Sequence, residues 1–335
     1  MPTIKPHLLP SNKTNYTKQA NEFSNKQLDV FWTPEEIKVE KDVQDILVNM
    51  TPSEKHGVIT VLKLFTLYEL FAGDEYWSKR FTSIFPDDPA MHRMASVFTM
   101  FELAVHGPFY QKLNEALFLD DEAFYTSYID NPVLKERMEF IDNIMTSKND
   151  LASLGVFSMV EGAILYTSFG YLKHFQSQGK NKLLNVVRGI NFSVRDENIH
   201  SLAGAWAFRT KKEQMNLSKK QEIELKETIL NAVLQLYAHE IEITNMIFEK
   251  GPIDGITPVQ LVHFVESRIN VCLEQLGYEK HFNVPYNPIG AWFYKGINNF
   301  QFNDFFSGVG PNYNRNWDES AFEYKEYDND SRQFI

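Results

Sequence analysis

The chain has 335 residues and a formal net charge of −11, from 33 Lys and Arg against 44 Asp and Glu. With 16 Gly, 14 Pro and 14% aromatic residues, it has few helix breakers and much apolar surface to bury, which excludes disordered and collagen-like architectures. Its one cysteine, Cys272, excludes an internal disulfide, a Cys-ligated zinc site and an iron–sulfur cluster. The negative charge, without any basic run, argues against nucleic acid as a partner. Any metal must therefore be bound by oxygen and nitrogen atoms.

Between a polar first segment and an acidic end, the spacing of apolar residues has the period of an α-helix. Residues 1–25 are polar and lack the apolar stretch of a signal peptide, so we expect a flexible segment of a cytoplasmic protein. Further along, apolar residues recur at i, i+3, i+4 and i+7, and strand-like alternation is almost absent. The predicted helices are 52–84, 89–117, 132–145, 151–178, 181–210, 218–248 and 257–276. Since no linker interrupts them, residues 26–316 are predicted to form one all-α, long-helix bundle domain. Residues 317–335 are acidic, lack a helical period and predict a flexible tail.

One apolar stretch, residues 151–172, has two interpretations, and the first is a membrane-spanning helix. It is 22 residues long, enough to span a bilayer, and Glu161 is its single charge. The alternative is a helix that is buried on all sides within a large protein. The buried helix is favoured, because a lone central carboxylate is costly in lipid and no second span of this kind exists.

Buried carboxylates and imidazoles are the strongest chemical signal in the sequence. Four glutamates and two histidines fall on faces that should be buried, on four different predicted helices: Glu69, Glu102 with His106, Glu161, and Glu197 with His200. A buried carboxylate without a partner costs several kcal/mol or takes up a proton. Two divalent cations would balance the four negative charges, and two neutral imidazoles would complete the ligand set. This is the ligand count of carboxylate-bridged dimetal bundles.

Each member of this pattern also has an ordinary explanation when it is taken alone. A single Glu-x-x-His pair arises often by chance, and a lone Glu in an apolar run can be protonated or paired with an arginine such as Arg195. The order along the chain favours the metal site, because Glu, Glu with His, Glu, and Glu with His fall on successive long helices. A helical pair at i and i+3 or i+4 shares one face, which suits both Glu–His pairs.

Pro108 predicts a local distortion of the helix that carries Glu102 and His106. Pro108 has no amide to donate to the Ala104 carbonyl, so the regular hydrogen-bond ladder is broken inside this helix. We expect a π-type widening around residues 102–108, which would turn both side chains toward the metals.

With these motifs, the sequence resembles the small, radical-generating (beta) subunit of class I ribonucleotide reductase. The resemblance covers most of the chain. Besides the six candidate ligands, it rests on Phe31-Trp32 followed by Pro34-Glu35-Glu36, on Tyr110 four residues after His106, on Arg195-Asp196 ahead of Glu197, on Asn287-Pro288-Ile289 ahead of Trp292, and on the acidic tail with its apolar end.

The resemblance implies a ferritin-like fold and a homodimer in the cytoplasm, with a dinuclear centre of iron, manganese or both. It implies that the protein oxidises this centre with O₂ or a reduced oxygen species, and passes a one-electron hole to a separate large subunit that makes deoxyribonucleotides. Tyr110 matches the radical tyrosine of the family. Trp32 and Asp196 match its internal path for electrons and protons, in which the carboxylate links the ligand His106 to the indole.

Several points remain open at this stage. Glu69 stands where the best-known di-iron members of the family carry Asp, so the metal and the place of the stored hole, Tyr110 or the metal pair, are undecided. In the tail, Phe334 and Ile335 suggest an anchor for the large subunit, with Tyr324 or Tyr327 as a relay or as incidental residues of a solubilising segment. The rival interpretations are a stand-alone dimetal oxygenase or oxidase, which needs a substrate pocket beside the metals, and a metal-storage bundle.

Overall fold

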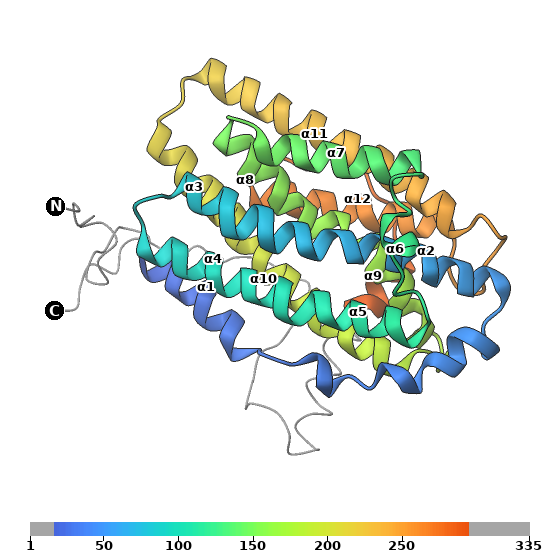
Figure 1. Ribbon diagram of the computed structural model, residues 1–335. Helices are drawn as coiled ribbons and strands as arrows, with labels where there is room; N and C mark the ends of the chain where they lie inside the picture. Colours follow the sequence, from blue (N-terminus) through green and yellow to red (C-terminus); the bar gives the residue numbers. More distant parts are fainter. Residues whose placement is uncertain (1–16, 295–335) are drawn as a thin grey trace.

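The computed structural model describes residues 17–294, apart from the side chains of residues 64, 66 and 67, and this part of the chain is helical with short connections. No strand is found among the described residues; one isolated bridge joins Ile253 and Ile256. The long helices lie roughly along one direction and form a bundle (Figure 1). The α-helices of the bundle are α1 (Thr17–Asp29), α2 (Pro52–Leu70), α3 (Thr82–Ile84), α4 (Pro89–Phe101), α5 (Gly107–Ala116), α6 (Glu122–Thr126), α7 (Pro132–Thr146), α8 (Asp150–Met159), α9 (Tyr166–Lys173), α10 (Leu184–Met215), α11 (Lys219–Ile247) and α12 (Pro258–Gln275). The all-α bundle is therefore confirmed.

Three of the long predicted helices continue through π-helical segments. The predicted helix 52–84 comprises α2, the π-helix η5 (Phe71–Phe81) and α3. The predicted helix 89–117 comprises α4, the π-helix η6 (Glu102–His106) and α5, and the predicted helix 151–178 comprises α8, the π-helix η7 (Val160–Ile164), α9 and the 3₁₀ turn η8 (His174–Gln176). Sequence periodicity could find these helices because a π turn adds one residue without breaking the rod.

The expected widening near residue 102 is confirmed in η6. The amide of Gly107 donates to the carbonyl of Glu102, five residues earlier, which is the π-helical bond. Pro108 follows at the point where a regular helix would need an amide for the carbonyl of Ala104. Asp88 caps the start of α4, which leads into η6, because its carboxylate accepts hydrogen bonds from the amides of Ala90 and Met91.

The apolar helix that could have crossed a membrane lies inside the bundle. The stretch Asp150–Gln176 is long and apolar enough for a span, but every residue of its most apolar window is buried within the protein. Asn149 caps its start by accepting a hydrogen bond from the amide of Ala152. The interpretation as a helix buried on all sides therefore agrees with the structure.

The helix that carries Glu197 starts at Leu184, three residues later than the sequence predicts, and runs to Met215. Two carboxylates from a distant segment hold its beginning. Asp42 accepts a hydrogen bond from the amide of Val186, and Asp45 accepts one from the amide of Leu183. These long-range caps satisfy amides that have no partner within the helix, and they set where α10 begins.

The first helix corrects the expectation of a flexible segment over residues 1–25. Residues 17–25 belong to α1, which packs on α4 and α10 and buries Ala20 and Phe23. The Phe23 ring lies 5.7 Å from the ring of Trp206. Sequence composition missed this helix because few apolar residues define its buried face. The boundary expected at residue 25 thus falls inside α1, whereas residues 1–16, the end of the expected domain and the tail 317–335 lie outside the described residues.

The remaining helices enclose those that carry the candidate ligands. α1 lies along one side of the bundle beside α4, and α7 and α11 lie on the opposite side (Figure 1). α12 packs against α9, α11 and η7. The result is an interior between α2, η6, η7 and α10 that is shielded on both sides.

Candidate metal centre

The six candidate ligands meet in this interior, and all of them are buried, with side chains at most 2% exposed. Glu69 lies near the end of α2, Glu102 and His106 are the first and last residues of η6, Glu161 lies in η7, and Glu197 and His200 lie in α10. They form two groups whose ligand atoms lie within 4.8 Å of one another: Glu69, Glu102, His106 and Glu197, and Glu102, Glu161, Glu197 and His200. The groups share two glutamates, so they are adjacent compartments of one site.

Glu102 and Glu197 bridge the two imidazoles. Glu102 places Oε2 3.0 Å from His106 Nδ1 and Oε1 2.7 Å from His200 Nδ1. Glu197 likewise places Oε1 3.1 Å from His106 Nδ1 and Oε2 3.5 Å from His200 Nδ1. Each of these carboxylates therefore offers one oxygen to each compartment, as a bridging carboxylate of a dinuclear centre would.

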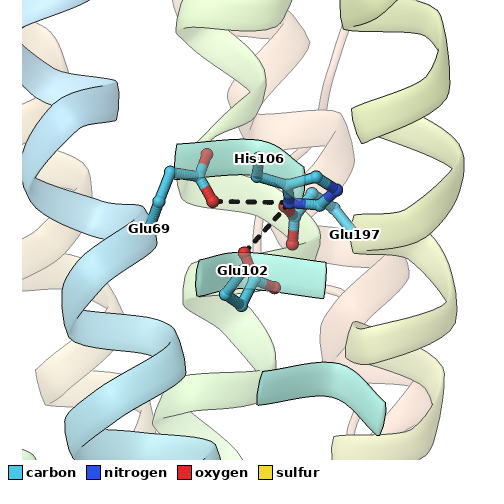
Figure 2. Close-up of side chains that lie close together, drawn as sticks. All are labelled: Glu69, Glu102, His106 and Glu197. Atoms are coloured by element: carbon cyan, nitrogen blue, oxygen red, sulfur yellow. Dashed lines mark hydrogen bonds and ion pairs between the residues drawn. The ribbon is translucent and has the colours of Figure 1, made fainter. Parts of the chain in front are cut away.

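Glu69 and Glu161 each serve only one compartment. Glu69 Oε2 lies 3.4 Å from His106 Nδ1, and Figure 2 shows Glu69, Glu102 and Glu197 converging on that imidazole. Glu161 Oε2 lies 3.9 Å from His200 Nδ1 in the other compartment. The two ends of the site are thus alike, with one terminal glutamate and one imidazole each.

Several of these atoms lack the hydrogen bonds that buried polar groups need. Glu69 Oε1, Glu102 Oε1, both oxygens of Glu197 and both ring nitrogens of His200 make no hydrogen bond of normal geometry within residues 17–294, although Glu102 Oε1 and His200 Nδ1 lie 2.7 Å apart. A cluster of buried acceptors without donors is costly unless a cation completes it. Carboxylate oxygens together with imidazole nitrogens suit first-row metals such as manganese and iron. The donor set therefore fits a dinuclear iron or manganese centre.

The pKa values of several candidate ligands are shifted in the protein without metal, because buried charges lie close together there. Burial, and then the charge of Glu102, raises the pKa of Glu69 well above its ordinary value. Burial, and then Glu197, does the same for Glu161. For His200, burial favours the neutral ring, but the charge of Glu102 prevails and raises the pKa to about 9. Protons thus take the place that cations would hold, and metal binding must displace them.

Asp196 connects the site to Trp32. Its Oδ2 accepts a hydrogen bond of 2.7 Å from the indole nitrogen of Trp32 and lies 3.2 Å from His106 Nε2. Arg195 Nε donates to Oδ1 at 3.3 Å. Burial alone would raise the pKa of Asp196, but Arg195 and the hydrogen bonds from His106 and Trp32 lower it below its ordinary value. An ionised Asp196 favours the His106 tautomer with hydrogen on Nε2, which leaves Nδ1 free to bind a cation.

Tyr110 lies in α5, one turn beyond His106, and is completely buried. Its ring stacks on Phe65 with a centroid separation of 4.4 Å and an interplanar angle of 5°. The Tyr110 hydroxyl lies beside the polar side chain of Ser193. It makes no hydrogen bond of normal geometry among the described residues. Burial, and then Glu69, raises the pKa of the phenol well above its ordinary value, so the ring stays protonated. Tyr324 and Tyr327 lie outside the described residues.

Sequence reasoning missed one residue that touches the site. Trp77 in η5 is fully buried, and its indole nitrogen donates a 3.0 Å hydrogen bond to Glu161 Oε1. The ring also lies 5.8 Å from that of His200. The only signal in the sequence is that Trp77 follows Glu69 by eight residues on one helix, which is too weak to point to a glutamate 84 residues away.

The candidate metal centre encloses a small cavity. Its walls include four of the candidate ligands, Glu69, Glu102, Glu161 and Glu197, together with apolar side chains such as Ile141 of α7. The free space inside has room for about one water molecule. This cavity is the space between the candidate ligands, so it is not a separate substrate pocket beside the metals.

A long-helix bundle with two histidines and four glutamates at its centre defines a ferritin-like dimetal-carboxylate protein. The model of the family "Ribonucleotide reductase, small chain" matches residues 12–288. The chain therefore belongs to the ribonucleotide reductase small-chain family, as the sequence motifs predicted.

Individual relatives agree with this assignment. Over 292 residues the chain is 27% identical to the ribonucleoside-diphosphate reductase subunit beta of Mycobacterium leprae (strain TN), covering 84% of this chain and 85% of that one. It is 25% identical over 195 residues to the ribonucleoside-diphosphate reductase 2 subunit beta of Escherichia coli (strain K12), covering 57% of this chain but only 58% of the relative. The crystal structure of the dimanganese(II) NrdF of Streptococcus sanguinis superimposes with a TM-score of 0.73 at 22% identity, covering 86% of this chain and 98% of that one. That likeness shows the shared fold.

Proposed function

We propose that this chain is the radical-generating small subunit of a ribonucleoside-diphosphate reductase. In this role it oxidises a dinuclear metal centre with O₂ or a reduced oxygen species, and passes a one-electron hole to a catalytic large subunit for deoxyribonucleotide synthesis. The observation that carries the proposal is a buried line of hydrogen-bonded side chains from Trp32 through Asp196 to His106. Asp196 Oδ2 lies 2.7 Å from the indole nitrogen of Trp32 and 3.2 Å from His106 Nε2. A storage bundle or a stand-alone oxidase has no use for such a line.

The metal ligands in this proposal are Glu69, Glu102, His106, Glu161, Glu197 and His200. Two bound ions of iron, manganese or both would supply the oxidising equivalent. Glu102 and Glu197 present one oxygen to each compartment, so they would hold both ions and keep them together. The buried setting excludes bulk water and strengthens each electrostatic contact.

Asp196 has two tasks along the line to Trp32. It keeps hydrogen on His106 Nε2, so that Nδ1 faces the centre, and it accepts the indole N–H of Trp32. When Trp32 gives up an electron, the N–H becomes more acidic, and the Asp196 carboxylate 2.7 Å away stabilises the positive ring or takes its proton. Arg195, which also donates to the carbonyl of Val30, holds Asp196 in place and ionised.

Tyr110 is the proposed organic site of the stored hole. Its burial against Phe65 shields the ring from solvent, which would lengthen the lifetime of a radical there. If Tyr110 stores the hole, Tyr110→Phe removes both the narrow tyrosyl doublet in the electron paramagnetic resonance spectrum and nucleotide reduction, with metal content unchanged. If the metals store it, the Tyr110→Phe protein keeps much of its activity.

The large subunit is the proposed partner, and the chain's own end is the proposed contact. Phe334 and Ile335 supply the apolar anchor, and Tyr324 or Tyr327 relays the hole. Deletion of the last 15 residues should leave metal binding intact and abolish nucleotide reduction, and Tyr324→Phe and Tyr327→Phe should show which phenol is needed. Full turnover by the shortened chain would exclude this contact. The protein is further proposed to be a cytoplasmic homodimer that binds neither nucleic acid nor membranes.

The decisive experiment compares two tryptophans. Trp32→Phe removes the indole N–H from the line to Asp196, so nucleotide reduction in the presence of the large subunit should fall by at least about a hundredfold while metal content stays normal. Trp206→Phe is the matched control, because Trp206 is also buried but packs on Phe23 away from the line. Equal activity of the two variants would refute the proposed role of Trp32, and normal turnover without any large subunit would favour a stand-alone oxidase.

A further inference from the structure

Two serines link the helices that carry Glu161 and His200. Ser158 Oγ in α8 donates to the carbonyl of Ser201 in α10, and Ser201 Oγ donates back to the carbonyl of Ser158, each at 2.9 Å. Both side chains are buried, with at most 1% exposed. Two reciprocal bonds to the backbone resist sliding of one helix along the other, because a shift would leave both hydroxyls and both carbonyls without these partners.

The helix backbones approach closely at this point, and glycines make it possible. A Cβ on Gly162 would lie 2.1 Å from Ser201 Oγ and 2.5 Å from the sulfur of Cys272. A Cβ on Gly204 would lie 3.2 Å from Ser158 Cβ. The packing is therefore so tight that the π turn η7 has no room to move toward α10.

The turn is also held by α12. Arg268 of α12 donates from Nε to the carbonyl of Gly162 at 2.9 Å, and its guanidinium lies 4.2 Å from the centre of the Tyr166 ring. Gly162 directly follows Glu161 in the chain, so the guanidinium binds the backbone next to a candidate ligand. Displacement of η7 would therefore break a hydrogen bond from a buried arginine.

The serine pair lies next to the candidate ligands on both helices. Ser158 precedes Glu161 by three residues, close to one helical turn, and Ser201 directly follows His200. Glu161 Oε2 lies 3.9 Å from His200 Nδ1, across the gap that the serines span. Fixing the two backbones at this level fixes the separation of these two ligands.

We propose that Ser158 and Ser201 are positioning residues of the metal centre, which set Glu161 against His200 and Glu197 through their reciprocal hydrogen bonds. The inference rests on the proposed dinuclear centre. The serines touch no metal themselves; they act through the backbone of η7 and α10. Their expected contribution is the one typical of groups that orient metal ligands, a loss of about tenfold or more in metal affinity when they are removed.

The test uses Ser158→Ala, Ser201→Ala and the double variant in the full-length chain. Ser24→Ala is the matched control, because Ser24 is fully buried and bonds the carbonyl of Ala20 within α1, away from η7. Manganese(II) is titrated into chelator-treated protein, and the electron paramagnetic resonance spectrum of bound manganese and the melting temperature of metal-free protein are recorded. Removal of one hydroxyl should lower the metal-free melting temperature by a similar small amount in every single variant. Only the Ser158 and Ser201 variants should bind manganese about tenfold more weakly and show a changed coupled spectrum.

Wild-type affinity and spectrum in both single variants would overturn the inference and leave the serines as packing residues. If the double variant does not fold, the single variants decide. Failure of the wild-type protein to bind manganese or iron would instead refute the proposed function, so the two outcomes are distinguishable.

Discussion

Two buried polar clusters lie close together in this bundle, and they handle charge in opposite ways. One is the metal centre, where four glutamates converge with two imidazoles. The other, which we call the arginine cluster, consists of Arg137, Glu240, Tyr68, His239 and the carbonyl of Leu236. Tyr68 and Glu69 are adjacent in α2, so the clusters share a helix.

The arginine cluster is complete without any ligand. Arg137 is fully buried and donates to Glu240 at 2.7 Å, to Tyr68 and to the carbonyl of Leu236 at 2.9 Å, and to His239 at 3.3 Å. One cation faces one carboxylate, and burial, with Arg137 opposing it, raises the pKa of the Tyr68 phenol to about 12, so that group stays neutral. Such a network adds rigidity, because removal of any member leaves a buried group unpaired.

In the metal centre, by contrast, the side chains do not satisfy one another's hydrogen-bonding groups. Its carboxylates outnumber the groups that could donate to them, and Glu69 and Glu197 keep oxygens without hydrogen bonds among the described residues. The comparison shows that burial alone does not identify a functional site, since both clusters are buried. An excess of buried acceptors does identify it, because protons or metal ions must be added to balance the negative charge.

The sharpest test of this contrast, with the largest expected effect, is removal of metal. Chelated protein should melt roughly 10 °C or more below protein reloaded with manganese or iron, since tight ligands of the folded state stabilise it by several kcal/mol. Differential scanning calorimetry of both forms measures the gap. Coinciding transitions would show that the acidic cluster, like the arginine cluster, needs no ligand.

This gap should widen as the pH rises from about 6 to about 9. Glu69 and Glu161 have raised pKa values through burial and neighbouring carboxylates, so they stabilise the metal-free fold below the ordinary value of 4.5 and lose that contribution as the pH rises through the folded values. His200, with burial opposing and Glu102 raising its pKa to about 9, likewise loses its contribution as the pH approaches 9. Metal binding strengthens over the same range because protons no longer compete. A gap that narrows at high pH would contradict this assignment.

Arg137→Met breaks the balanced cluster instead. It leaves Glu240 buried without its cation, which should cost about 3–5 kcal/mol of unfolding free energy. Denaturant titration measures the loss, and metal content should stay at the wild-type level because no candidate ligand is touched. A large loss of metal together with a small loss of stability would show that the two clusters are coupled through α2.

The same isosteric change should act with opposite sign in the two clusters. Glu240→Gln weakens the bond to Arg137 and should destabilise the protein by about 1–3 kcal/mol with metal binding retained. Glu69→Gln removes a carboxylate that has too few donors, so the metal-free protein should be as stable as wild type or more stable. Its metal affinity should drop by about tenfold or more. Equal destabilisation of both metal-free variants would erase the distinction between the clusters.

Tyr68→Phe should have the smallest effect. It deletes one hydroxyl that Arg137 donates to and leaves the other contacts of the cluster in place. The expected cost is about 1 kcal/mol, from one unpaired donor of the guanidinium. Metal content is the control, and a marked loss of metal would mean that Tyr68 supports its neighbour Glu69 directly.

Much of this protein was readable from local sequence. Helical periodicity placed the long helices within a few residues of their ends, and Glu102, His106 and Pro108 predicted the π turn that the structure contains. The candidate ligands were recognisable because carboxylates in apolar helical runs conflict with burial, whatever surrounds them. These features depend on residues up to five apart, so helix geometry and backbone hydrogen bonding are enough to predict them.

Only the tertiary structure decided the partners of those residues. Trp77 reaches Glu161 across 84 positions, and Arg137 reaches Glu240 across 103. The sequence pattern does not predict α1, because its buried face can be recognised only where α1 packs against α4 and α10. The division of Glu102 and Glu197 between two imidazoles, and the serine bonds between α8 and α10, likewise arise where helices cross. Such contacts depend on the packing of whole helices, in which close fit selects one register among many, and no local pattern in the chain records which register that is.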